Sequence, residues 1–447
     1  TRMTLLRIDQ LGQSLSIVVA IALLSSCQTS TKRSDELPRA ATTESSFKPH
    51  TYAVHASGSE ELVQLGLQHH PGIKAAEAKV RRLQAKIDQV TTLPDPKAKI
   101  TSGSMAETAA GRVEFMAGVE QGIPFPGKLR ERGSIAEREA ATAAANLEAM
   151  KLQVAQQIRQ FYWNYFLAVR TTDITAVSRQ VLELVRSTID VRVTVNQAAQ
   201  GDQLRLSTEL GNIDKALIEA KQREESANAM LNAMLNRPSG ASLPRPSNLT
   251  TPSSGELQTL VARAEAEHPE VAASRTQIEA FRHRLRAAEL DRYPDFMFGL
   301  QCAAVSNAGI APPVIKNGRD QIFASIGVNI PLWQKPRKAK IREAAEGIEE
   351  AEARLVAIRA NLRFRVEDAW LRAQSSRDLI ALFEARIIPE SKQAFDVSLQ
   401  SYAAEKLTFV DILDTWRKWL GYQLQQAQNR TALGKAAADL RSATGNL

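Results

Sequence analysis

Histidines, cysteines and methionines are the residues of this chain that could bind a metal ion or react. It has six histidines and two cysteines, and no HExxH, CxxC or paired-cysteine spacing joins them. His69 and His70 are adjacent, so on a helix their side chains diverge by about 100° and do not converge on one ion. The sequence therefore predicts no metal site. Helix starts and helix surfaces are the expected positions of His50, His55, His69, His70, His268 and His283.

Patterns typical of catalysis or cofactor binding do not occur in the sequence either. Gly127 and Gly133 are too sparse around Lys128 to cradle a phosphate, and there is no nucleophile elbow or Gly-rich dinucleotide turn. Met230 and Met234 lie one helical turn apart, which suits a copper site or a helix seam, and the flexible thioether favours the seam. The sequence predicts no enzyme, no catalytic residue and no cofactor.

The chain is basic, with a net charge of +8 and an isoelectric point of about 9.4. Lys and Arg alternate with Asp and Glu along the whole length, and no basic block is interleaved with aromatic residues. A nucleic-acid surface requires such a block. We therefore expect solvated helix surfaces and no nucleic-acid partner.

The N-terminal residues resemble a bacterial export signal. Arg2 and Arg7 precede an apolar run, Leu15–Leu24, which is followed by Ser25, Ser26 and Cys27. A basic start, a short apolar core and small residues before the cut are typical of a secretory signal, here residues 1–26. The cysteine resembles that of a lipobox, so we expect lipidation of Cys27 and a tether over residues 27–56. The alternative is an ordinary signal with a chance cysteine. An aspartate directly after the cysteine would resemble a signal for retention in the inner membrane. Gln28 occupies that position instead, which favours the outer membrane.

Four short motifs occur twice and in the same order, about 200 residues apart, which indicates a duplicated unit. The Pro- and Ser-rich residues 238–255 are typical of a linker. We therefore predict a first repeat over 57–237 and a second over 256–447. The paired motifs are His70-Pro71 and His268-Pro269, Leu93-Pro94-Asp95 and Tyr293-Pro294-Asp295, Ile123-Pro124 and Ile330-Pro331, and Asp202-Gln203-Leu204 and Asp411-Ile412-Leu413.

Long helices follow the strand candidates in both repeats. No proline lies between Pro126 and Pro238, and apolar residues recur at three-four spacing from Leu147 to Ala168 and from Leu355 to Ile387. This spacing predicts coiled-coil seams. A helix from about Lys128 to Val195 would be on the order of 100 Å long at ~1.5 Å per residue. Few compact enzymes need such a rod, whereas a trunk that crosses a periplasm does.

Strand candidates lie where the helices break, over about 97–121 and 296–330. Apolar residues alternate with polar or small ones from Val113 to Val119 and from Ile322 to Ile330. Such alternation is typical of a lipid-facing barrel strand, with a soluble hairpin as the alternative. Four strands do not close a barrel, whereas three chains would supply twelve. Val113, Phe115, Ile322, Ala324 and Ile326 are expected to face lipid. No apolar run beyond residue 27 suits a membrane helix, so a barrel is the expected way to cross a membrane.

The order of elements and the duplication resemble the TolC-like outer-membrane efflux family over residues 57–447. The motifs resemble its heavy-metal (CusC/CzcC-type) branch. The resemblance implies a homotrimer with a shared 12-stranded barrel and a helical periplasmic tunnel, docked to a periplasmic adaptor and an inner-membrane RND-type pump. The motifs that carry it are Leu93-Pro94-Asp95-Pro96, Gln121-Gly122-Ile123-Pro124-Phe125-Pro126-Gly127-Lys128 and Val410-Asp411-Ile412-Leu413-Asp414.

The resemblance also implies positions for a gate and for the adaptor-contacting tips. Asp396 resembles the acidic residue that forms an aspartate ring at the periplasmic constriction, and Glu405 is the next candidate; a solvated helix charge is the alternative for Asp396. The second tip, Ala403 to Lys406, lacks a glycine that the family usually places there. The expected tip residues are Asn196, Gln197, Gly201, Asp202, Ala404, Glu405, Lys406 and Asp411.

The expected fold is mainly α with a membrane β-barrel portion. The expected function is passive conduction, from the pump and adaptor to the exterior, by a lipid-anchored outer-membrane channel whose helical trunk lies in the periplasm. The exported substrate stays open, with metal cations or drugs as candidates. Two other functions compete. A periplasmic adaptor would have one hairpin flanked by Gly-rich β segments, and a coiled-coil scaffold would need no alternating strands bounded by Ile-Pro.

Overall fold

The structure is a computed structural model that describes residues 58–102, 107–108, 111–194, 200–246, 255–306 and 320–447. All of these belong to the second of two units, residues 50–447. The predicted signal peptide, Cys27 and the tether lie outside the described residues, as do Asn196, Gln197 and residues 247–254 of the predicted linker. None of the helices in the described ranges has the length and apolar character needed to span a membrane.

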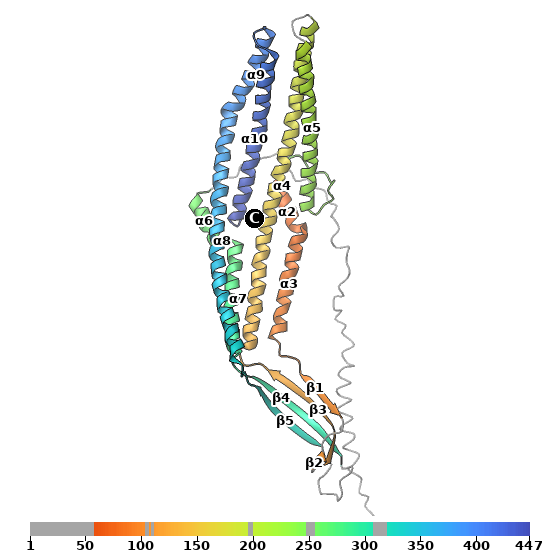
Figure 1. The fold of residues 1–447 in the computed structure, drawn as a ribbon, viewed down its shortest axis with the longest axis vertical. Helices are drawn as coiled ribbons and strands as arrows, with labels where there is room; N and C mark the ends of the chain where they lie inside the picture. The colour runs from red at the N-terminus through yellow and green to blue at the C-terminus, as the bar shows by residue number, and fades with distance from the viewer. Residues whose placement is uncertain (1–57, 103–106, 109–110, 195–199, 247–254, 307–319) are drawn as a thin grey trace, which may run out of the picture. The chain divides into compact units, whose positions relative to one another are not determined.

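Two successive sets of elements have the same order: two short helices, two main strands, then long helices (Figure 1). The longest helix, α4, has 67 residues, which confirms the rod expected from about residue 128 to 195. The first set is α2 (Ser59–His69), α3 (Pro71–Thr91), β1 (Lys97–Ser102), β2 (Glu107–Thr108), β3 (Gly111–Ile123), α4 (Lys128–Thr194) and α5 (Gln200–Met234). The second is α6 (Leu257–Glu267), α7 (Pro269–Leu290), β4 (Asp295–Ser306), β5 (Gln321–Asn329), α8 (Gln334–Leu382), η2 (Phe383–Ile387), α9 (Ile388–Ala403) and α10 (Phe409–Ala443).

The repeated His-Pro motifs begin helices α3 and α7. In each, the histidine is the N-cap and the proline occupies the first helical turn, where a missing N–H costs nothing. The ring Nδ1 of His70 accepts a hydrogen bond from the backbone N–H of Gly72 (3.1 Å), and that of His268 accepts from Glu270 (3.2 Å). These two histidines therefore cap helices, as expected for histidines at helix starts.

The π-helical turn η2 lies between α8 and α9, immediately before Pro389. Proline has no N–H to donate to the carbonyl four residues earlier, here that of Ala385. A wider turn accommodates this missing bond, so α8 and α9 continue as one interrupted helix against α10.

Four apolar clusters hold the described helices together; the smallest, formed by Ala373, Leu433 and Ala436, joins α8 to α10. The first joins α2 and α3 to α4 and the end of α5, and the third joins α6, α8 and the end of α10. The second joins α4, α5, α9 and α10 near the hairpin ends; its buried residues are Leu182, Val185, Ile189, Leu206, Leu210, Ile213, Phe395, Tyr402, Phe409, Ile412, Leu413 and Trp416. The three-four spacing in the sequence thus corresponds to buried seams.

The strands form one antiparallel sheet in the order β1-β3-β4-β5, with the two-residue β2 paired to β3. The central pair, β3 and β4, comes from the two different sets of elements. Strands β1 and β5 are therefore the edges of the sheet in the part of the chain that the structure describes.

Candidate functional site: sheet face, strand–helix junction and hairpin ends

One face of the sheet is predominantly apolar. Directly paired residues of an antiparallel sheet share a face and successive residues alternate between faces, so the register assigns each side chain. Ile322, near the start of β5, and Ile326, in its middle, lie on this face and are each 74% exposed. The face comprises Ala98, Ile100, Phe115, Ala117, Val119, Gln121, Ile123, Phe296, Phe298, Leu300, Cys302, Ala304, Ile322, Ala324, Ile326 and Val328, with the polar Ser102, Arg112 and Ser306 at the end of the sheet away from the helices.

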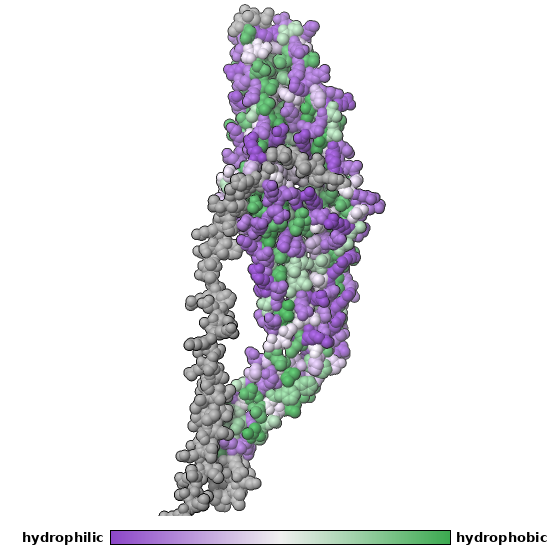
Figure 2. All heavy atoms as spheres, turned by 180° about the vertical axis from the view of Figure 1, so that it is seen from behind, coloured by the Kyte–Doolittle hydropathy of each residue, from purple (hydrophilic) through white to green (hydrophobic). Residues whose placement is uncertain are grey.

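The opposite face is more polar and carries small residues. It contains Lys97, Lys99, Glu120, Gln301, Ser325 and Asn329, together with several glycines and the apolar Met116, Met297 and Phe323. Hydrophobic residues gather over the strands in Figure 2, whereas hydrophilic residues predominate along the helices. A sheet with one exposed apolar face requires a cover of hydrocarbon or protein.

The register corrects one residue of the expected lipid-facing set. Val113 pairs with Val305, whereas Phe115 pairs with Ala304, and the β-bulge between them leaves Glu114 unpaired. Because Val305 and Ala304 are successive residues, Val113 lies on the opposite face from Phe115. Simple alternation placed both on one face because a bulge inserts an extra residue that the sequence pattern does not show.

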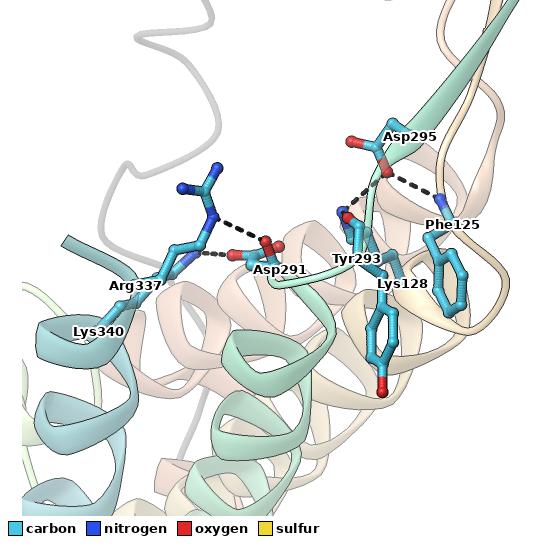
Figure 3. Close-up of polar contacts among 7 residues, drawn as sticks. All are labelled: Phe125, Lys128, Asp291, Tyr293, Asp295, Arg337 and Lys340. Atoms are coloured by element: carbon cyan, nitrogen blue, oxygen red, sulfur yellow. Dashed lines mark hydrogen bonds and ion pairs between the residues drawn. The ribbon is translucent and has the colours of Figure 1, made fainter. Parts of the chain in front are cut away.

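A buried lysine ties the strands to the helices where they meet (Figure 3). The Lys128 ammonium donates to a carboxylate oxygen of Asp295 (2.8 Å) and to the backbone oxygen of Tyr293 (2.9 Å). The same Asp295 oxygen accepts from the backbone N–H of Phe125 (2.8 Å), and the Phe125 ring stacks on Tyr293 with centroids 4.5 Å apart. Lys128 therefore fixes the start of α4 to the start of β4. Its role is structural, in agreement with the sequence, in which too few glycines surround Lys128 to form a phosphate-binding loop.

A second ionic link lies beside the first. The Asp291 carboxylate accepts from the Lys340 ammonium (2.5 Å), and its backbone oxygen accepts from Arg337 (3.0 Å). These contacts join the end of α7 to the start of α8. Residues of both links line a cavity of about 400 Å³ together with Trp333.

At the far end of α4, Arg192 joins the two hairpins. Its guanidinium donates to the backbone oxygen of Tyr402, lies 4.7 Å from the centroid of the Tyr402 ring, and reaches a carboxylate oxygen of Glu405 at 3.3 Å. The Arg192 side chain is only 10% exposed. The link therefore connects the end of α4, in the first repeat, to the turn after α9, in the second.

In the turn after α9, Glu405 occupies the kind of position for which the resembled family usually has a glycine. Glu405 has a φ of 61°, in the left-handed region that glycine adopts without strain. The ion pair with Arg192 holds Glu405 in this conformation. Three residues further on, Thr408 and Asp411 form a capping box in which the Asp411 carboxylate accepts from the Thr408 N–H (2.9 Å) and hydroxyl (2.7 Å). Asp411, an expected adaptor contact, thus also starts α10.

The other expected gate and tip residues that the structure describes lie near these ends on exposed or partly exposed positions. Asp396 is on α9, about half exposed, and its carboxylate accepts from Lys392 (2.6 Å). Asp202 pairs with Arg205 in the first turn of α5 (3.6 Å), next to exposed Gly201. Ala404 and Lys406 are exposed in the same turn as Glu405. Asn196 and Gln197 are not described.

Sequence reasoning missed Arg192, and also the pair formed by Glu209 and Arg417. Both Arg192 and Glu209 occupy seam positions, because Arg192 continues the spacing of Leu182, Val185 and Ile189. These two residues could have been found from the sequence, because a charged side chain at an apolar seam position is buried and therefore needs an oppositely charged or hydrogen-bonding partner. Within the described ranges, no group of three His, Cys, Asp or Glu side chains is arranged to hold a metal ion.

Comparisons with known proteins agree with this architecture. Residues 260–446 match the family described as "Outer membrane efflux protein". The match covers the part of the chain from α6 to the end of α10. Among curated relatives of this chain is the cobalt-zinc-cadmium resistance protein CzcC of Cupriavidus metallidurans, 21% identical over 84% of this chain and 88% of that protein.

Solved structures show the same fold in other proteins. The outer membrane protein VceC of Vibrio cholerae superimposes on this chain with a TM-score of 0.73 at 18% identity, over 87% of this chain and 96% of VceC. CusC, in structures described as showing transmembrane channel formation, gives a TM-score of 0.72 at 15% identity, over 90% and 96%. The mainly helical fold with a small share of strands, expected from the sequence, is confirmed.

Proposed function

We propose that this protein is the outer-membrane channel of a tripartite efflux system and conducts its cargo passively to the exterior. The observation that carries the proposal is the apolar sheet face joined rigidly, through Lys128 and Asp295, to the start of a 67-residue helix. The sheet supplies a surface suited to hydrocarbon, and the helices supply a trunk that reaches away from it.

Three copies would complete the structure. Strands β1 and β5 leave their outer edges unpaired within the described residues, and an exposed edge is a template for another strand. The four main strands of each copy, joined edge to edge, would make a barrel of twelve strands, which is enough to enclose a channel. The apolar face would then contact lipid, and the polar face would line the lumen.

The hairpin ends suit contact with a periplasmic adaptor that leads to an RND-type inner-membrane pump. The candidate tip is formed by the first turn of α5 and the turn from Ala404 to Lys406; Asn196 and Gln197, which precede α5 in the sequence, lie outside the described residues. Asp396 and Glu405 lie on the approach to this end and are the candidates for the gate. The two repeats, 57–237 and 256–447, would contribute one hairpin each.

The cargo is proposed from the relative named for cobalt, zinc and cadmium resistance: divalent metal cations. A passive duct need not bind them, so the proposal requires no metal site and no catalysis.

The N-terminal signal and Cys27 support a lipid anchor. A fatty-acid analogue should label the wild-type protein and leave Cys27→Ala unlabelled, and equal labelling of both would exclude the anchor.

The alternative functions fit less well. Neither a periplasmic adaptor nor a scaffold requires an exposed apolar sheet face of this extent. An adaptor would also have one long hairpin, whereas this chain has two, one in each set of elements.

The test is assembly and conduction. Full-length protein, extracted in detergent, should have the mass of three chains plus bound detergent, and should produce discrete ion-conducting events in planar bilayers. A monomeric mass together with silent bilayers would contradict the channel proposal.

A further inference from the structure

The segment that joins β5 to α8 has an unusual run of exposed apolar residues. After the strand ends at Asn329, Ile330 and Leu332 remain largely exposed and Trp333 is 78% exposed. The apolar character of the sheet thus continues past the last strand residue, along the same side of the strand for Ile330. Packing within the chain therefore does not account for these side chains.

A cluster of positive charge follows at once. The first turns of α8 contain Lys335, Arg337, Lys338, Lys340 and Arg342, and no acidic residue occurs from Gln321 to Arg342. Two of these cations are used internally: Arg337 and Lys340 both bond to Asp291 at the end of α7 (Figure 3).

The remaining three cations share a different face of the helix. At ~100° per residue, Lys335, Lys338 and Arg342 lie within about 60° of one another. This direction is opposite to that of Lys340 and to that of the buried Ala344 and Ala351. All three are exposed and form no ion pair with any residue in the described ranges.

We propose that Trp333, Lys335, Lys338 and Arg342 form a binding edge for the headgroups of anionic phospholipids in the membrane leaflet nearest the helical trunk. The inference rests on the proposed channel function. Along the chain, Ile326, Trp333 and Lys338 follow the order of hydrocarbon, interface and phosphate through a leaflet. Indole rings are favoured at the interface, and Lys and Arg pair with anionic headgroups beside it.

Two features favour an anionic phospholipid as the ligand: the apolar sheet face runs on into this edge, and the edge carries three positive charges that are unpaired among the described residues. The edge extends the apolar sheet face without a break, so a lipid whose chains cover Ile326 and Val328 presents its headgroup near Trp333 and the cations. A zwitterionic headgroup supplies no net charge to balance three free cations, whereas an anionic one does. Removing one cation near a charged membrane surface should weaken binding roughly fivefold.

The experiment uses the assembled protein in detergent, mixed with equal amounts of phosphatidylglycerol and phosphatidylcholine and examined by native mass spectrometry. Wild-type protein should retain phosphatidylglycerol in preference. The triple variant Lys335→Gln, Lys338→Gln, Arg342→Gln should lose the preference, by roughly fivefold for each cation removed. Trp333→Ala should reduce retention of both lipids.

The matched control is Lys215→Gln, Lys221→Gln, Arg223→Gln, which removes the same charge from exposed positions of α5. It should retain the wild-type preference. An unchanged preference in the first triple variant would overturn the proposal, as would equal loss in the control. A first triple variant that no longer has the trimer mass would also overturn it, because the cations would then face a neighbouring copy. Wild-type protein that conducts ions without lipid preference contradicts only the lipid edge, whereas protein that neither conducts nor binds lipid contradicts the channel.

Discussion

The guanidinium of Arg417 on α10 donates two hydrogen bonds to the carboxylate of Glu209 on α5, at 3.0 and 2.6 Å. The two helices belong to different hairpins, so this pair and the Arg192–Tyr402 link hold the first hairpin against the second. Glu209 is nearly buried, whereas Arg417 is more than half exposed. Hydrogen bonds from Arg417 lower the pKa of Glu209 and outweigh burial, which raises it.

Stability should therefore depend on pH through Glu209. Because its pKa is lower in the folded protein than in the unfolded chain, its contribution is present above the unfolded value of about 4.3 and is lost as pH falls below it. Glu209→Gln should lower stability by about 1 kcal/mol at neutral pH, since one partner is exposed. Thermal melting followed by circular dichroism should show the difference between wild type and variant shrinking from pH 6 towards acid pH (near ~4 and below). A constant difference would show that the pair does not titrate.

His268 should give a sensitivity in the same direction, with stability lost as pH falls, but closer to neutral pH. It is 2% exposed, and burial lowers its pKa, which nearby Glu270 partly raises and Arg365 lowers further. Nδ1 must be unprotonated to accept from the Glu270 N–H, while Nε2 faces the backbone oxygen of Ser442. The neutral ring therefore stabilises the fold fully above pH ~6.5, and this contribution falls as pH decreases below that value.

His268→Asn tests this pH dependence, because asparagine caps a helix without titrating and loss of a cap costs about 1 kcal/mol. The melting temperature of wild type should fall more than that of the variant between pH 7.5 and 5.5. Parallel curves would mean that protonation of His268 does not affect the cap.

Much of the fold was predictable because it depends on repeating patterns. The proline-free stretch with three-four apolar spacing predicted α4 to within a residue at its end, and the Ile-Pro motifs marked the ends of the strands. Local exceptions were not predictable: the bulge beside Glu114 changes the face of Val113, and the partners of Arg192 and Glu209 lie more than 200 residues away. Such contacts depend on how helices meet in space. The sequence shows only that a charge occupies a seam.

Neighbouring residues of β5 provide a test of which sheet face contacts lipid. Ile326 lies on the apolar face and Ser325 on the other. Ile326→Arg should destabilise membrane insertion by about 2–4 kcal/mol if it lies near the bilayer midplane, whereas Ser325→Arg should be tolerated in a polar lumen. Urea titrations of refolding into lipid vesicles measure the difference. By the same argument Phe115→Arg should be costly and Val113→Arg mild; equal costs within either pair would refute the assignment of faces.

Arg192 should hold the hairpin ends together. Its removal leaves the Glu405 carboxylate without a partner in a left-handed turn and takes the cation away from the Tyr402 ring. We therefore expect Arg192→Ala to raise single-channel conductance in planar bilayers without changing the trimer mass. Arg186→Ala is the matched control, because Arg186 lies on the same helix and is exposed, with only loose ion pairs to Glu183 and Asp190. An increase in both variants would indicate a general loosening of α4.

Asp396 should set which ions enter if it forms a ring at the constriction. Three-fold symmetry would bring three copies together, and carboxylate rings favour cations. Repulsion between two carboxylates about 6 Å apart is only ~0.7 kcal/mol in bulk-like water, so packing at Arg192 and Tyr402 must keep the gate closed, and the ring acts on selectivity. Asp396→Ala should therefore shift the reversal potential towards lower cation preference while conductance stays low, the reverse of the Arg192→Ala phenotype. Asp368→Ala, which likewise removes a carboxylate paired with a cation one helical turn away, should do less, because Asp368 lies on α8, further from the hairpin end. If Asp396→Ala leaves the reversal potential unchanged and Glu405→Ala shifts it, the ring is formed by the turn instead of by α9.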